Sequence, residues 1–126
     1  MGYPSFGKSL ADMADEVREI NIEKGWRSAD GGPGTNTFGD YIALLHSELS
    51  EALEAYRDWR LVDATEPHQG AKPEGVGSEL ADVLIRLLDT CDVFGINLTA
   101  EYERKVAFNR TRPFQHGGRT LADAKP

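Results

Sequence analysis

Apolar residues recur at helical spacing in four stretches of the chain. The first stretch has Ser9 as a candidate N-cap and Gly25 as its end, and its apolar positions are Leu10, Met13, Ala14, Val17 and Ile20. A second runs from Thr37 to about Arg60, a third over about 78–94 and a fourth over about 99–111, before Pro113. No stretch alternates convincingly in the way of a strand, so the pattern predicts an all-α fold.

Glycine and proline mark the connections between these stretches. Residues 30–36 predict a flexible link, with a cover over a substrate as the alternative, and residues 61–76 predict a long linker. The tail over 113–126 is polar. Four short helices are few for this chain, so we expect a single domain, 1–126, resembling a four-helix bundle whose core is completed by a second copy.

Composition and net charge limit the classes of molecule that the chain is expected to bind. The chain has 126 residues, 40% of them hydrophobic and 28% charged, which is ordinary for a soluble folded protein. Its net charge of −7 disfavours nucleic acid polymers and anionic membranes. The lone Cys91 cannot form an intramolecular disulfide and is predicted to be buried. Without a long apolar run or an apolar N-terminal segment, the chain is expected to be cytoplasmic.

Two pairs of carboxylates stand where apolar residues are expected. At about 100° per residue, Glu48 falls within the apolar arc of the second helix, and Glu51 lies at its edge. The third helix repeats this spacing with Glu79 and Asp82. A buried carboxylate without a partner is costly, so this arrangement needs cations or basic residues. Oxygen ligands without His or Cys favour Mg²⁺ or Mn²⁺.

A purely structural interpretation accounts for part of this pattern. Glu79 would complement a helix dipole, Asp82 would pair with Arg86, and Glu51 would be solvated. This interpretation leaves Glu48 unexplained. A di-iron centre is disfavoured because no Glu is followed three residues later by His.

Three segments carry a resemblance to a known family. HSELSEALEAYR (46–57) and GSELADVLIRLLD (77–89) resemble the metal-binding helices of the MazG-like all-α nucleoside triphosphate pyrophosphohydrolases, and KVAFNRTRPFQHGG (105–118) resembles their phosphate-contacting segment. The resemblance implies that Glu48, Glu51, Glu79 and Asp82 bind Mg²⁺, with Mn²⁺ as a substitute. It also implies hydrolysis of a nucleoside triphosphate to the monophosphate and pyrophosphate. We expect a homodimer or homotetramer.

The same resemblance suggests residues that bind the substrate. Lys105, Asn109 and Arg112 are spaced to share a helix face and would clamp phosphates. The alternative is that Lys105 pairs with Glu101 and that Arg112, before Pro113, has left the helix. Trp26 resembles an aromatic position near the base pocket, although core packing is the simpler interpretation.

One position departs from the family pattern. Many members carry a glutamate directly before the first metal ligand, and this chain has Ser47 there. Glu48 and Glu51 are then the candidate catalytic residues, with Glu51 orienting the attacking water. The departure also keeps open a non-catalytic helical module that binds a nucleotide or a protein. A purely structural helical oligomer is the third interpretation.

Overall fold

The computed structural model describes residues 7–57 and 75–114, and these form four α-helices. In chain order they are α1 (Leu10–Glu23), α2 (Phe38–Arg57), α3 (Val76–Val93) and α4 (Leu98–Thr111), and the described residues include no strand. The prediction of an all-α fold is therefore confirmed. The region 58–74, with Trp59 and most of the expected linker, lies outside the described residues, as does the tail from 115 onward.

Side-chain caps fix the beginnings of α1, α2 and α4. Ser9 Oγ accepts a hydrogen bond from the backbone N–H of Asp12, as expected. At α2, the Thr37 hydroxyl accepts from the Asp40 N–H at 3.1 Å, and the Asp40 carboxylate accepts from the Thr37 N–H at 2.8 Å. Asn97 caps α4 in the same way as Ser9 caps α1. The predicted beginnings were therefore accurate to within one residue in these three helices.

The third helix begins before its predicted start at Ser78. Gly75 precedes it with φ at 113°, a conformation that glycine adopts easily, so α3 gains Val76 and Gly77. At its other end Gly95 has φ at 68°, as expected for a residue just past a helix. Two edge-to-face ring contacts also hold this end, because Phe94 packs against Phe38 and Tyr41 at the beginning of α2.

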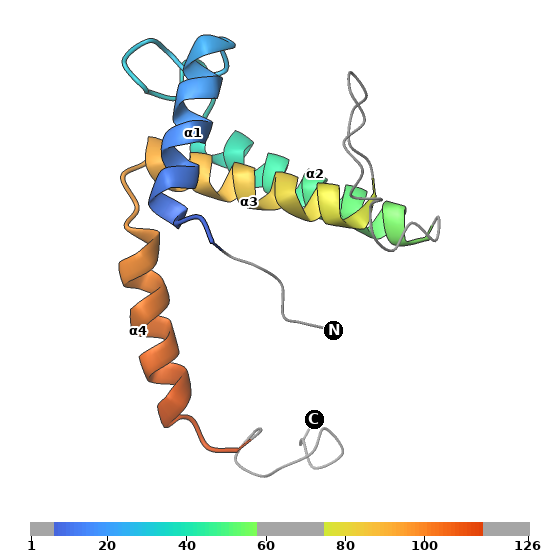
Figure 1. Cartoon of the computed structure of the whole chain (residues 1–126), viewed down its shortest axis with the longest axis vertical. Coiled ribbons are helices and arrows are strands. Elements are labelled where there is room, and N and C mark those ends of the chain that lie inside the picture. Colours follow the sequence, from blue (N-terminus) through green and yellow to red (C-terminus); the bar gives the residue numbers. More distant parts are fainter. Residues whose placement is uncertain (1–6, 58–74, 115–126) are drawn as a thin grey trace. The chain divides into compact units, whose positions relative to one another are not determined.

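The chain divides into two compact units, Met1–Ile96 and Asn97–Pro126. In the first unit α2 and α3 lie side by side and antiparallel, and α1 packs against α3 (Figure 1). The second unit contains α4, on which no side chain is buried. No helix in the described part of the chain is long and apolar enough to cross a membrane.

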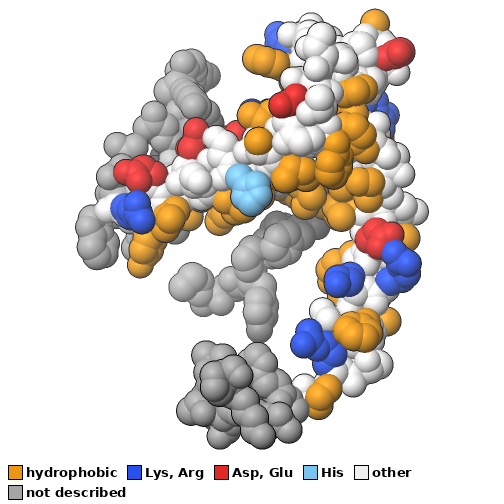
Figure 2. Space-filling model, turned by 180° about the vertical axis from the view of Figure 1, so that it is seen from behind, with side chains coloured by type: hydrophobic (Ala, Val, Ile, Leu, Met, Phe, Trp, Pro, Cys, Tyr) orange, Lys and Arg blue, Asp and Glu red, His pale blue; other side chains and the backbone are white. Residues whose placement is uncertain are grey.

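The hydrophobic core of the described residues is thin. Its buried apolar side chains are Val17, Tyr41, Ala52, Leu88 and Cys91. The predicted burial of Cys91 is confirmed, and burial raises the pKa of its thiol. Several large apolar side chains of α2 are half exposed instead, among them Leu49 (50%), Leu53 (51%) and Tyr56 (54%). Exposed hydrophobic side chains are visible over a broad part of the surface in Figure 2.

A buried arginine anchors the connection between α1 and α2. The Arg27 guanidinium donates to the carbonyl oxygen of Gly31 and to the carboxylates of Asp89 (3.3 Å) and Asp92 (2.8 Å) on α3. Arg18 of α1 donates to the same Asp92 carboxylate through two nitrogens. The segment predicted as a link is thus fastened to the helices through its backbone.

Trp26 corrects one expectation. It lies immediately before Arg27 and is 71% exposed, so the core-packing interpretation of this residue is wrong. The buried side chain in this part of the connection is that of Arg27, because its charge is matched by two aspartates.

Candidate metal centre

Three glutamates meet where α2 and α3 pack together. Glu48 and Glu51 are on α2 and Glu79 is near the beginning of α3, and one carboxylate oxygen from each lies within 4.8 Å of the other two. The spacing of three residues places Glu48 and Glu51 on adjacent positions of one helix face. Because α3 runs antiparallel to α2, its first turn comes opposite the second half of α2 (Figure 1).

Burial makes this cluster unusual. Glu48 is only 9% exposed, as its place in the apolar arc predicted. Its Oε2 atom, and the Oε2 atom of Glu79, are both buried without a hydrogen-bond partner in the described part of the chain. Carboxylate oxygens rarely stay unpaired when removed from water, because the lost hydration costs several kcal/mol, of order 2 to 7 for a polar group. The two oxygens therefore call for a positively charged ligand.

The electrostatics of Glu79 support the same conclusion. Removal from water raises the pKa of its carboxyl group, and a hydrogen bond with Glu51 raises it further. The negative charges of Glu51, Asp82 and Glu48 act in the same direction. A proton shared between carboxylates, or a metal ion, relieves this repulsion.

The donor set suits a hard divalent cation. All three ligands offer carboxylate oxygen, which Mg²⁺ and Mn²⁺ prefer, and neither His nor Cys takes part. Asp82 lies one turn beyond Glu79 and contributes negative charge to it, but it is not one of the three mutually close carboxylates. The structure therefore brings together three of the four predicted ligands and places the fourth beside them.

Arg86 has a different partner from the one that the structural interpretation expected. That interpretation paired it with Asp82 on α3. Its Nε donates instead to Oε1 of Glu48 on α2, at 3.1 Å. The carboxylate cluster thus has one cation at its border, and that cation joins the two helices.

The predicted phosphate-binding residues belong to the second unit. Lys105 and Asn109 lie on α4 and are exposed. Glu101 pairs with Arg104. Arg112 is the C-cap of α4, with extended backbone at φ −72° and ψ 143°, so the expectation that it shares a helix face with the other two is wrong. The residue before a proline avoids the helical conformation, and Pro113 follows it.

The sequence pattern did not predict the network that joins Arg18 and Arg27 to Asp89 and Asp92. A signal for it was present, because Asp89 and Asp92 interrupt the apolar end of the third helix in the same manner as Glu79 and Asp82 interrupt its beginning. Each of these aspartates contacts arginine, whereas in the described part of the chain the arginine contact of the glutamate cluster is made by Glu48.

Comparison with known proteins adds no relative. No protein-family model, curated protein or solved structure matches the chain.

Proposed function

We propose that this chain is a Mg²⁺-dependent nucleoside triphosphate pyrophosphohydrolase of the MazG-like all-α type. The observation that carries the proposal is the pair of buried, unpaired oxygens on Glu48 and Glu79 within the three-glutamate cluster. The resemblance of segments 46–57, 77–89 and 105–118 to that family supplies the reaction.

Each candidate site residue would have a role that follows from the chemistry of its side chain. Glu48, Glu51 and Glu79 would hold the ion, with Asp82 adding negative charge next to them. When bound, Mg²⁺ supplies neutralisation of the triphosphate and polarisation of a phosphoryl group. Glu51 is the exposed member of the cluster and is the residue we assign to orient an attacking water. Lys105 and Asn109 would bind phosphate oxygens, and Trp26 offers an exposed ring for stacking with a base.

The proposal includes a second copy of the chain. In helical projection the apolar arc of α2 is about 180° wide, and only the half toward α3 is buried. The other half carries Leu49, Leu53 and Tyr56 and no charged residue. A charge-free face on a chain of net charge −7 suits the same face of another copy, because an apolar contact avoids the repulsion between like-charged surfaces.

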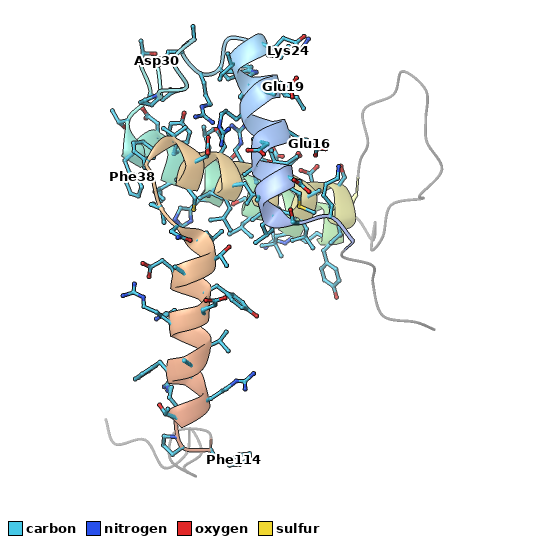
Figure 3. All side chains as sticks on the ribbon, turned by 60° about the vertical axis from the view of Figure 1, so that its left-hand side comes forward. Glu16, Glu19, Lys24, Asp30, Phe38 and Phe114 are labelled. Atoms are coloured by element: carbon cyan, nitrogen blue, oxygen red, sulfur yellow. The ribbon has the colours of Figure 1, made fainter. Side chains whose placement is uncertain are left out.

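A release assay tests the reaction directly. Pyrophosphate release is measured from the eight common ribo- and deoxyribonucleoside triphosphates with Mg²⁺, and the wild type is compared with the double variant Glu48→Gln, Glu79→Gln. Turnover that disappears in the double variant supports the proposal and identifies the preferred base. Glu19→Gln, an exposed change on α1, serves as the matched control for loss of one carboxylate (Figure 3).

Absence of turnover with all eight nucleotides would overturn the proposed reaction. If nucleotide binding persisted in that case, the chain would be a non-catalytic nucleotide-binding module. Ser47→Glu would then test whether the glutamate that many family members have at this position restores activity.

A further inference from the structure

Arg86 lies on the α3 face that carries Glu79 and Asp82. The three residues are spaced at i, i+3 and i+7, which places them within about 60° of one another around the helix. Glu79 extends from this face into the cluster, and the Arg86 Nε reaches Glu48 across the helix interface. The same face of α3 therefore supplies one carboxylate of the cluster, that of Glu79, and one cation, Arg86. That cation contacts a second carboxylate of the cluster, that of Glu48.

The two oxygens of Glu48 have different surroundings. Oε1 accepts the hydrogen bond from Arg86 at 3.1 Å, whereas Oε2 is buried without a partner. A glutamate side chain has three rotatable bonds, and a fixed bond to one oxygen restricts where the other points. A hydrogen bond to the second oxygen of a metal-binding carboxylate orients the ligand and strengthens metal binding.

We propose that Arg86 is a positioning residue, which holds Glu48 through Oε1 so that Oε2 is directed to the metal ion. This inference rests on the proposed function, because it concerns the same ion. Arg86 itself needs no contact with metal or substrate. Its effect is exerted through Glu48, and its side chain, 40% exposed, can keep the bond while the ion binds.

The opposite role for Arg86 would be a built-in competitor that occupies Glu48 until an ion displaces it. The geometry favours positioning, because Arg86 bonds to Oε1 and leaves the buried Oε2 without a hydrogen-bond partner. The two roles predict opposite changes in metal affinity when the guanidinium is removed. If Arg86 positions Glu48, removal of the guanidinium loosens the Glu48 side chain and weakens metal binding. If Arg86 competes with the ion for Glu48, its removal strengthens metal binding.

The test compares Mg²⁺ binding by the metal-free wild type, Arg86→Met and Arg86→Lys, measured by calorimetry with the metal alone. Positioning predicts that Arg86→Met weakens Mg²⁺ binding by about tenfold or more, with Arg86→Lys between it and the wild type. Arg57→Met is the matched control, because Arg57 is an exposed arginine on α2 whose partner is Glu54, and its affinity should equal that of the wild type. Thermal unfolding without metal checks that each variant folds.

A second measurement separates positioning from general damage to the fold. In the release assay, the Mg²⁺ concentration for half-maximal rate should rise in Arg86→Met, and saturating Mg²⁺ should restore most of the maximal rate. Unchanged or tighter Mg²⁺ binding in Arg86→Met, with normal binding by the wild type, would overturn the role of Arg86 alone. Failure of the wild type to bind Mg²⁺ or Mn²⁺ would overturn both this inference and the proposed function.

Discussion

Glu79 illustrates how a single residue of a candidate site can oppose folding. Its carboxyl is partly removed from water and is surrounded by the charges of Glu51, Asp82 and Glu48. We expect Glu79→Gln to raise the free energy of unfolding of the metal-free protein by about 1 kcal/mol, because it removes this repulsion without changing shape. Denaturant unfolding in the presence of a chelator measures the change.

The same variant should lose stabilisation by metal. If Mg²⁺ binds the folded chain as proposed, it should raise the unfolding temperature of the wild type, and Glu79→Gln should respond weakly or not at all. Glu19→Gln should behave like the wild type in both conditions, since Glu19 is an exposed residue of α1. A metal-free Glu79→Gln that is clearly less stable than the wild type would contradict this account of the cluster.

Asp92 makes the stability of the fold depend on pH under acidic conditions. Hydrogen bonds from Arg18 lower the pKa of its carboxyl to about 2, with Arg27 contributing in the same direction despite the loss of water around the group. The unfolded chain has a pKa near 3.9, so it binds more protons than the folded chain between these values. The contribution, about 2 kcal/mol, is complete above about pH 4 and is lost as the pH falls toward 2.

Asp92→Asn should remove this contribution. At neutral pH the variant should unfold about 2 kcal/mol more easily than the wild type, and the difference should shrink between pH 4 and pH 2. Urea unfolding at a series of pH values provides the measurement. An equal difference at pH 7 and pH 2.5 would show that Asp92 acts by packing rather than by its charge.

Single residues also show which features of the structure could be predicted from the sequence. Burial of Glu48 followed from its angle in the apolar arc, because that angle depends only on helix geometry. The partner of Arg86 did not follow, since a contact between helices depends on how α2 and α3 are aligned. Core packing was the simpler interpretation of Trp26, but Trp26 is exposed and the adjacent Arg27 is buried, because two aspartates match the charge of Arg27.

At the scale of elements, Arg27 joins the connection between α1 and α2 to α3. Its guanidinium contacts the connection at Gly31 and α3 at Asp89 and Asp92, and it is almost fully buried. Arg27→Met should lower the free energy of unfolding by about 3 kcal/mol, because it leaves buried carboxylate without its partner. Arg27→Lys should recover little, since an ammonium group cannot reproduce the planar fork that reaches all these acceptors.

Chemical denaturation of both variants measures this effect. Arg104→Met is the matched control, because Arg104 is an exposed arginine of α4 whose pair with Glu101 is on the surface, and such pairs contribute little to stability. Full recovery by Arg27→Lys would show that charge alone holds the connection.

Elements were more predictable from the sequence than their connections. Two helix beginnings depend on local hydrogen bonds, those made by Ser9 and by Thr37 with Asp40. A few neighbouring residues of the sequence are therefore enough to predict them. The link at 30–36 carries no such local signal for its anchoring. Its attachment comes from Arg27 and from aspartates more than 60 residues away in the chain, and no local pattern records a contact of that separation.

At the scale of the whole molecule, the exposed apolar half of α2 predicts self-association. Leu49→Glu with Leu53→Glu would place two charges on this face, and repulsion between facing copies should convert the proposed oligomer to a monomer. Light scattering coupled to size exclusion measures the mass. Ala43→Glu is the matched control, because Ala43 is an exposed residue of α2 that lies about 120° from Leu49 around the helix and ten residues from Leu53 along the chain.

The thin core adds a second consequence of the same substitution. Since Val17, Tyr41, Ala52, Leu88 and Cys91 are the buried apolar side chains of the described residues, one copy has little apolar burial to offset the conformational entropy of folding. If the apolar face of α2 is covered by a second copy, the wild type should unfold at a temperature that rises with protein concentration, and the double variant should not. A wild type that is monomeric and unfolds independently of concentration would mean that α2 leaves this face in water.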